Sequence, residues 1–141
     1  MKMNKRILFL LFMIFTFTLT ACQKKAEPAD TPDEDEIIKE ATEYFEQMRA
    51  GDFETFYNAL PEGVKKQTKS PQTIQKAWDE AAEKAGGLPE DSEPEVTCYG
   101  TEKSDQIRVE FVIPCEKEDF KVLINYDSSG RLYNYVIWKN N

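Results

Sequence analysis

The chain has 141 residues, a net charge of −8 and no histidine. The length fits one domain, and the negative charge argues against nucleic acid as a partner, because phosphate groups repel such a surface. Without histidine, a Ser-His-Asp or Cys-His nucleophile, a histidine zinc site and the usual base with a pKa near neutral are excluded. The sequence also lacks a glycine-rich phosphate loop and a CxxC pair, so it predicts no cofactor and no metal site.

Residues 1–21 have the pattern of a bacterial lipoprotein signal peptide. Lys2, Lys5 and Arg6 precede an uncharged, apolar stretch that ends in the lipobox sequence LTAC at Cys22. In such proteins the cysteine receives a diacylglyceryl group, and cleavage before it leaves the lipid on the new N-terminus. A retained membrane helix is the alternative, but the stretch is short for the roughly 20 residues of a span. We therefore expect a lipid anchor at Cys22 that holds the protein on the extracytoplasmic face of the cell membrane.

Residues 22–35 separate this signal from the globular part. They contain Pro28, Pro32, small residues and charges, but no large apolar side chain after Cys22, which is typical of a flexible acidic linker. Residues 1–21 hold three of the 18 basic residues and no acidic one, so 15 basic and 26 acidic residues give the mature chain a charge of −11. Residues 36–141 are then expected to form a single domain.

Apolar residues next recur at helical spacing in three segments. The first predicted helix runs from about Pro32 to Arg49, where Ala50-Gly51 provides a stop. The second follows Asp52, a suitable cap, and the third begins at Ser70-Pro71 and ends at Gly86-Gly87. The predicted apolar faces consist of Ile37, Ile38, Ala41, Tyr44, Phe45 and Met48, then Phe53, Phe56, Tyr57 and Leu60, then Ile74, Ala77, Trp78, Ala81 and Ala85.

After Pro94 the apolar periodicity changes to two, which is typical of strands. Residues 107–113 and 120–126 alternate apolar and polar side chains, while residues 132–138 are apolar on both faces. Short turns at 102–105, 116–119 and 127–130 are expected to join the strands of residues 95–139 into an antiparallel meander. The pattern predicts an α+β fold in which three N-terminal helices pack on one face of a four-stranded antiparallel sheet.

A series of packing and turn residues runs through the predicted domain. It consists of Ala41, Phe45, Gly51-Asp52-Phe53, Val64-Lys65, Ile74, Trp78, Gly86-Gly87, Tyr126-Asp127 and Gly130-Arg131-Leu132. Over about residues 36–138 this series resembles domain-of-unknown-function family 3887. The resemblance implies a cystatin-like, or nuclear-transport-factor-2-like, fold in an extracytoplasmic protein, and it brings no catalytic residues. Ten residues between Leu60 and Pro71 leave little room for the additional hairpin of larger relatives, which argues against a deep, enclosed cavity.

An enzyme without histidine would have to use carboxylates and tyrosines. Isomerases and dehydratases of related folds combine an aspartate base with tyrosine donors. The corresponding pool here is Tyr44, Asp52, Tyr57, Glu110, Tyr133 and Tyr135. Each has a structural alternative, because tyrosines at core positions usually pack and expose only the hydroxyl, Asp52 can cap a helix, and Glu110 falls on a polar face. The candidate pocket consists of Tyr44, Tyr57, Trp78, Glu110 and Tyr135, although Trp78 fits a core position better than a stacking platform.

Two cysteines, Cys98 and Cys115, remain if Cys22 carries the lipid. A turn near Ser104 places Cys98 opposite Val109 or the residue after it, and Cys115 lies five or six residues further along the strand. At ~3.3 Å per residue that separation is about 15–20 Å, whereas a disulfide needs Cα atoms within about 7 Å. We therefore expect two buried free thiols, even in a compartment that permits disulfides.

Together these features favour a non-catalytic accessory or partner-binding module of the cell envelope. Its partner would be an envelope protein or a cell-wall component. A protein that binds a small apolar ligand between helices and sheet is one alternative, and a weak enzyme of the isomerase or dehydratase type is another. A pocket with convergent polar groups would favour the alternatives, and a filled core beside an exposed apolar patch would favour the binding module. The sequence leaves the oligomeric state open.

Overall fold

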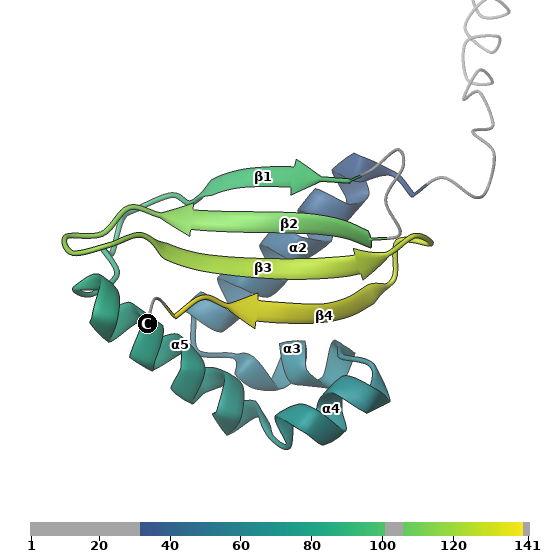
Figure 1. The fold of residues 1–141 in the computed structure, drawn as a ribbon, viewed down its shortest axis with the longest axis horizontal. Helices are drawn as coiled ribbons and strands as arrows, with labels where there is room; N and C mark the ends of the chain where they lie inside the picture. Colours follow the sequence, from purple (N-terminus) through teal and green to yellow (C-terminus); the bar gives the residue numbers. More distant parts are fainter. Residues whose placement is uncertain (1–31, 101–105, 140–141) are drawn as a thin grey trace, which may run out of the picture.

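In the computed structural model, residues 32–100 and 106–139 are described, and helices precede strands. The described helices are α2 (Glu34–Arg49), α3 (Phe53–Ala59), α4 (Glu62–Thr68) and α5 (Pro71–Ala85). The strands are β1 (Glu95–Tyr99), β2 (Gln106–Ile113), β3 (Phe120–Asp127) and β4 (Leu132–Ile137). All pairs are antiparallel in the order β1-β2-β3-β4 (Figure 1).

This arrangement confirms the α+β class and the meander, but the expected number of helices is wrong. The described chain has α4 between the second and third predicted helices. The predictions for the signal peptide of residues 1–21, for Cys22 and for the turn at residues 102–105 lie outside the described residues, as does most of the linker. Asp33 caps α2 by accepting a hydrogen bond from the N–H of Asp35 at 3.0 Å, so α2 begins inside the segment assigned to the linker.

The helix α4 was not predicted from the sequence because it has no apolar stripe. Val64 is its one large apolar side chain, and Gly63 lies in its first turn. Contacts from outside the helix hold it instead. The Tyr57 hydroxyl donates to the carbonyl of Lys69 at 3.1 Å, and the Thr68 hydroxyl lies 3.5 Å from the hydroxyl of Tyr135. A short helix that is stabilised by tertiary contacts leaves little periodicity to detect.

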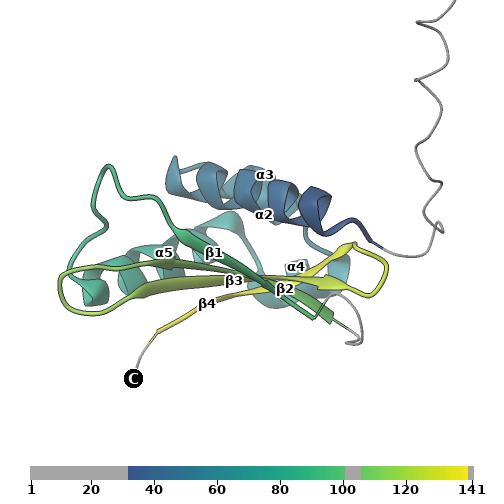
Figure 2. The same ribbon diagram turned by 90° about the horizontal axis from the view of Figure 1, so that it is seen from above.

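The helix α2 crosses one face of the sheet, the helices α3, α4 and α5 lie along the β4 side, and the opposite face is open (Figure 1). Figure 2 shows α2 lying across one side of the strands, and α5 contacts β3 and β4. The core between the layers is rich in aromatic rings. Phe45 stacks on Phe111 with centroids 4.6 Å apart, and Trp78 meets Phe120 edge-on at 4.7 Å. Trp78 is only 5% exposed, which confirms its expected place in the core.

The strand register confirms the prediction for the cysteines. Cys98 pairs with Val109, and Cys115 follows the end of β2, so the two thiols are free. Both are half-buried, so the expectation of two buried thiols is wrong: β1 is an edge strand, and Cys115 lies in the loop that follows β2. Burial and the negative charge of Glu34 raise the pKa of Cys98, against a smaller opposite effect of a hydrogen bond from the backbone of Tyr99.

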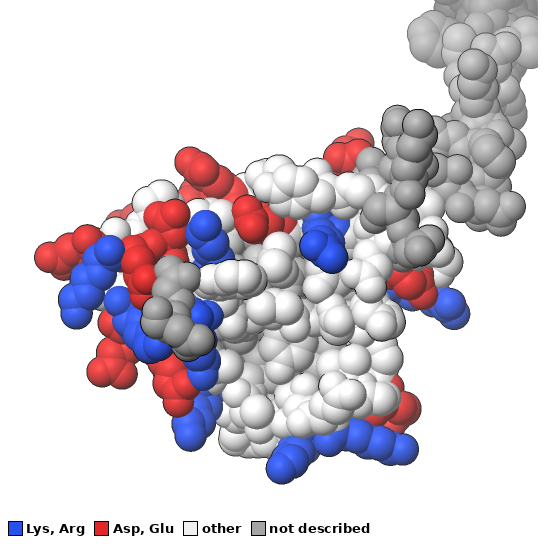
Figure 3. All heavy atoms as spheres, in the orientation of Figure 1, with Lys and Arg blue, Asp and Glu red and all other residues white. Residues whose placement is uncertain are grey.

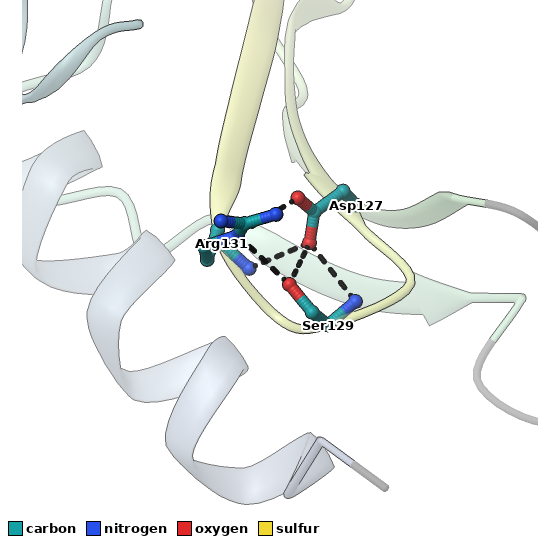
Figure 4. Close-up of polar contacts among 3 residues, drawn as sticks. All are labelled: Asp127, Ser129 and Arg131. Carbon is teal, nitrogen blue, oxygen red and sulfur yellow. Dashed lines mark hydrogen bonds and ion pairs between the residues drawn. The ribbon is translucent and has the colours of Figure 1, made fainter. Parts of the chain in front are cut away.

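The turn that joins β3 to β4 is organised by Asp127 (Figure 4). One carboxylate oxygen accepts the hydroxyl of Ser129 at 2.6 Å and the N–H groups of Ser129 and Arg131 at 2.9 and 3.0 Å. The other accepts Nε of Arg131 at 3.1 Å. The hydrogen bond from Ser129 contributes most to lowering the pKa of Asp127 to about 2. Gly130 has a φ of 79°, and a Cβ there would lie 2.9 Å from the Cβ of Pro32, so this turn packs closely on the segment before α2.

Candidate functional site

The residues of the expected pocket are dispersed over the fold. Trp78 is a core residue, and Tyr44 lies half-buried on α2. The Tyr44 hydroxyl donates to a carboxylate oxygen of Glu40 at 3.1 Å. Burial, and then the negative charge of Glu40, raise the pKa of Tyr44 to about 12. A phenol with this pKa keeps its proton at neutral pH, which makes it a poor acid or base.

Three further members of the tyrosine and carboxylate pool have structural partners. The Asp52 carboxylate accepts the N–H of Thr55 at 3.1 Å, so it caps α3 as expected. Tyr57 closes the end of α4 through its bond to the carbonyl of Lys69. Glu110 lies on the open face of the sheet, where one of its oxygens accepts the Tyr99 hydroxyl at 3.5 Å. These residues do not converge on a common cavity.

A groove of about 600 Å³ lies between β4 and the helices α4 and α5. Its lining consists of Pro61, Gly63, Val64, Gln67 and Thr68 beside and in α4, Ala77 in α5, and Tyr133, Asn134, Tyr135 and Ile137 in β4. None of these lining residues is charged, although 31% of the chain is Asp, Glu, Lys or Arg. Of the five residues in the expected pocket, Tyr135 alone belongs to this lining. We call this site the β4 groove.

Packing behind β4 fixes the wall of the β4 groove. The ring of Tyr135 meets Phe56 edge-on with centroids 5.3 Å apart, and burial raises the pKa of the Tyr135 hydroxyl. Asn134 accepts a hydrogen bond from Nδ2 of Asn125 at 2.6 Å. The register shifts between Asn125 and Tyr126, which leaves Tyr133 as an extra residue in β4. Tyr133 is 45% exposed and forms part of the rim.

The surface around the β4 groove is also poor in charge. Figure 3 shows uncharged surface over the centre of the molecule, from the strands toward α4, with acidic and basic side chains gathered around its borders. Among the described residues, large exposed hydrophobic side chains occur at both edges of the sheet: Val96 and Tyr99 on β1, and Tyr133, Val136 and Trp138 on or directly after β4. An exposed apolar region with a charged border is typical of an interaction site.

The β4 groove is suited to binding and poorly suited to proton transfer. Its lining offers the amides of Gln67 and Asn134 and the hydroxyls of threonine and tyrosine for hydrogen bonds. Of its lining residues only tyrosines are ionisable, so it supplies no base with a pKa near neutral. Within residues 32–100 and 106–139, no group of three or more cysteines and carboxylates is arranged to hold a metal ion.

Of the residues that line this site, the sequence placed only Tyr135 in a candidate pocket. Residues 132–138 were expected to form a strand that is apolar on both faces, and this property leaves Tyr133 and Val136 exposed beside the groove. The opposite wall was not predicted, because α4 was not predicted. The usable signal was the length of the connection from Leu60 to Pro71, which is ample for two helical turns.

No family model, no curated protein and no solved structure matches this chain. In the described part of the chain, none of the helices combines the length and the apolar content needed to cross a membrane. The geometry and chemistry of the β4 groove are therefore the guide to function.

Proposed function

We propose that this protein is a non-catalytic binding module whose β4 groove receives an uncharged part of its partner. The observation that supports this proposal most strongly is the absence of charged residues from the groove lining in a strongly charged chain. The free-energy cost of removing water is small for uncharged groups, whereas it is large for charges that find no partner. The core behind the groove is filled with packed aromatic rings, which favours a surface partner over a small ligand enclosed between helices and sheet.

The cellular setting is part of the same proposal. Residues 1–21 act as a lipoprotein signal peptide, Cys22 carries the lipid, and residues 22–35 tether the domain to the extracytoplasmic face of the membrane. The partner is an envelope protein or a cell-wall component. The order of helices followed by a meander, with α2 across one face of the sheet, supports the cystatin-like fold and the relation to family 3887. Lipid labelling that persists in Cys22→Ala would contradict the anchor.

Site-specific photo-crosslinking in living cells tests the proposed binding surface. A photoreactive phenylalanine analogue replaces Tyr133 on the rim of the β4 groove, or Thr97, which is exposed on β1. We expect a discrete adduct from position 133 and none from position 97. Val64→Glu places a charge in the groove and should remove the adduct, and circular dichroism on the purified variant checks that the domain remains folded. Equal adducts at both positions, or an adduct that survives Val64→Glu, would contradict the proposal.

A further inference from the structure

We propose that the β4 groove binds by strand addition: an extended peptide with uncharged side chains pairs with the free edge of β4. This inference depends on the proposed function, because it names the occupant of the same groove. It predicts a main-chain interaction in addition to side-chain contacts, and that distinction can be tested separately.

The strand register shows which backbone groups of β4 are free to pair. The N–H of Trp138 donates to the carbonyl of its direct partner Lys121 at 2.9 Å, so this is a hydrogen-bonded pair. Such pairs alternate along an antiparallel ladder. Val136 and Asn134 therefore bond to β3, whereas the N–H and C=O groups of Tyr135 and Ile137 point away from it.

These outward groups reach the β4 groove, because Tyr135 and Ile137 both line it. β4 is the last strand of the sheet, and across the described chain no backbone hydrogen bond joins these two residues to α4 or α5. Main-chain N–H and C=O groups require hydrogen-bond partners, which solvent supplies at an exposed strand edge. A second strand would supply the same partners at the correct spacing, as in other proteins that bind peptides by strand addition.

The shape of the β4 groove fits a short peptide strand. The lining residues of β4 span Tyr133 to Ile137, and five residues of a strand extend over about 16 Å. Side chains of an added strand alternate between two directions. Those level with Tyr135 and Ile137 would face the helices, where Val64 and Ala77 are apolar, and the others would face the open side of the sheet. The peptide should therefore carry uncharged side chains at every second position.

Neither a second copy of the chain nor the opposite edge offers the same fit. The helix α4 already forms one wall of the groove, so the sheet edge of a second copy would bring its own helices against α4, whereas a single strand would not. The opposite edge strand, β1, has five residues, four of them exposed, and contributes none of the lining of the β4 groove.

The test uses the full chain in a non-ionic detergent and a phage-displayed library of random heptapeptides as the probe. Selected peptides are synthesised with a fluorophore, and their affinity is measured by fluorescence polarisation. Ile137→Pro removes one outward N–H without removing a bond to β3, and proline is tolerated on such an edge. Ile137→Ala is the matched control, because it reduces packing at the same position but keeps the N–H. We expect binding to weaken about tenfold in Ile137→Pro and to change less than about threefold in Ile137→Ala.

A second measurement leaves the protein unchanged, so it remains decisive if Ile137→Pro fails to fold. N-methylation of each peptide amide in turn should weaken binding about tenfold at alternate positions, because every second N–H of an added strand points to β4. Peptides selected by the library should also avoid Asp, Glu, Lys and Arg at every second position.

Several results would overturn strand addition. If binding is lost in Val64→Glu but is insensitive to Ile137→Pro and to N-methylation, the β4 groove recognises side chains alone, and only the proposed function survives. If no peptide is selected, or if a chito-oligosaccharide binds in a Val64-dependent way instead, the occupant is not a peptide. If the chain forms dimers that Ile137→Pro dissociates, a second copy covers the edge. The proposed function itself fails if position 133 gives no adduct, if position 97 gives an equal one, or if the adduct survives Val64→Glu.

Discussion

The core and the β4 groove are both uncharged, but the core is closed and packed by side chains, whereas the groove is open to solvent. Four residues of α5 are buried in the core, namely Ile74, Trp78, Ala81 and Ala85. The neighbouring α4 contributes one buried residue, Thr68, and turns several side chains toward the groove. Burial of apolar surface stabilises the fold and so explains the composition of the core. It does not explain the absence of charge from an open groove.

This difference separates structural from functional positions. Substitutions in the core should lower stability and affect binding only through unfolding. Substitutions in the β4 groove should affect binding while the domain stays folded.

The two tryptophans provide the sharpest contrast. Trp78→Ala removes a side chain that packs against Phe45, Phe53 and Phe120, and should destabilise the domain by about 3–5 kcal/mol. Trp138 is 52% exposed, so Trp138→Ala should cost less than about 1 kcal/mol. Urea unfolding measures both values. Similar losses for the two variants would mean that the assignment of core and surface is wrong.

Gly130→Ala should destabilise the turn between β3 and β4 by about 1–3 kcal/mol. The reasons are its positive φ and the contact that a Cβ would make with Pro32. Gly63→Ala is the control, because Gly63 lies in α4 with open space around it, and alanine there should be neutral or stabilising by up to about 1 kcal/mol. The melting temperature should therefore fall in Gly130→Ala, and it should stay the same or rise in Gly63→Ala.

Tyr57→Phe should loosen α4 without disturbing the core. The variant loses the hydrogen bond to the carbonyl of Lys69 at the end of α4, which is worth about 0.5–1.5 kcal/mol. Backbone amides of α4 should then exchange with solvent faster, while those of α5 stay protected.

Asp52→Ala should similarly expose the start of α3, because the N–H of Thr55 loses its acceptor. Glu54→Ala, one position into α3, is the matched control and should have the smaller effect.

The smallest expected effect is the pH dependence that Asp127 confers. Its pKa falls from 3.8 to about 2 in the folded protein, so its contribution to stability is present above about pH 4 and is lost as the pH falls toward 2. In urea unfolding from pH 2 to 5, the difference between the parent and Asp127→Asn should be largest above pH 4. A difference that does not change with pH would contradict this role of the carboxylate.

The sequence predicted elements that carry their own local signals. Gly86 ends α5 in the left-handed conformation and Asp52 caps α3. An expected turn near Ser104 was enough to predict Cys98 opposite Val109 or the residue after it, and the register pairs it with Val109. The short helix α4 could not be predicted from local sequence patterns, because Tyr57 and Tyr135 hold it through contacts that are distant in sequence. The β4 groove could not be predicted for the same reason, because one of its walls is α4.

The expected pocket shows a second limit of sequence reasoning. Residue type suggested that Tyr44, Glu110 and Tyr135 share a site, but type does not specify which face of which element a side chain occupies. Tyr44 bonds to its own helix, Glu110 lies on the open face of the sheet, and Tyr135 lines the groove. Only the packing of α4 and α5 against β4 determines which residues meet.

Backbone hydrogen exchange at β4 tests the central claim most directly. NMR exchange rates are measured on the full chain with and without a peptide selected as above. In the free chain, the N–H groups of Tyr135 and Ile137 should exchange rapidly, while that of Val136 is protected by its bond to β3. Peptide binding should protect Tyr135 and Ile137 selectively. Strong protection of these two amides in the free chain, or no change when the peptide binds, would contradict a free β4 edge that takes a partner strand.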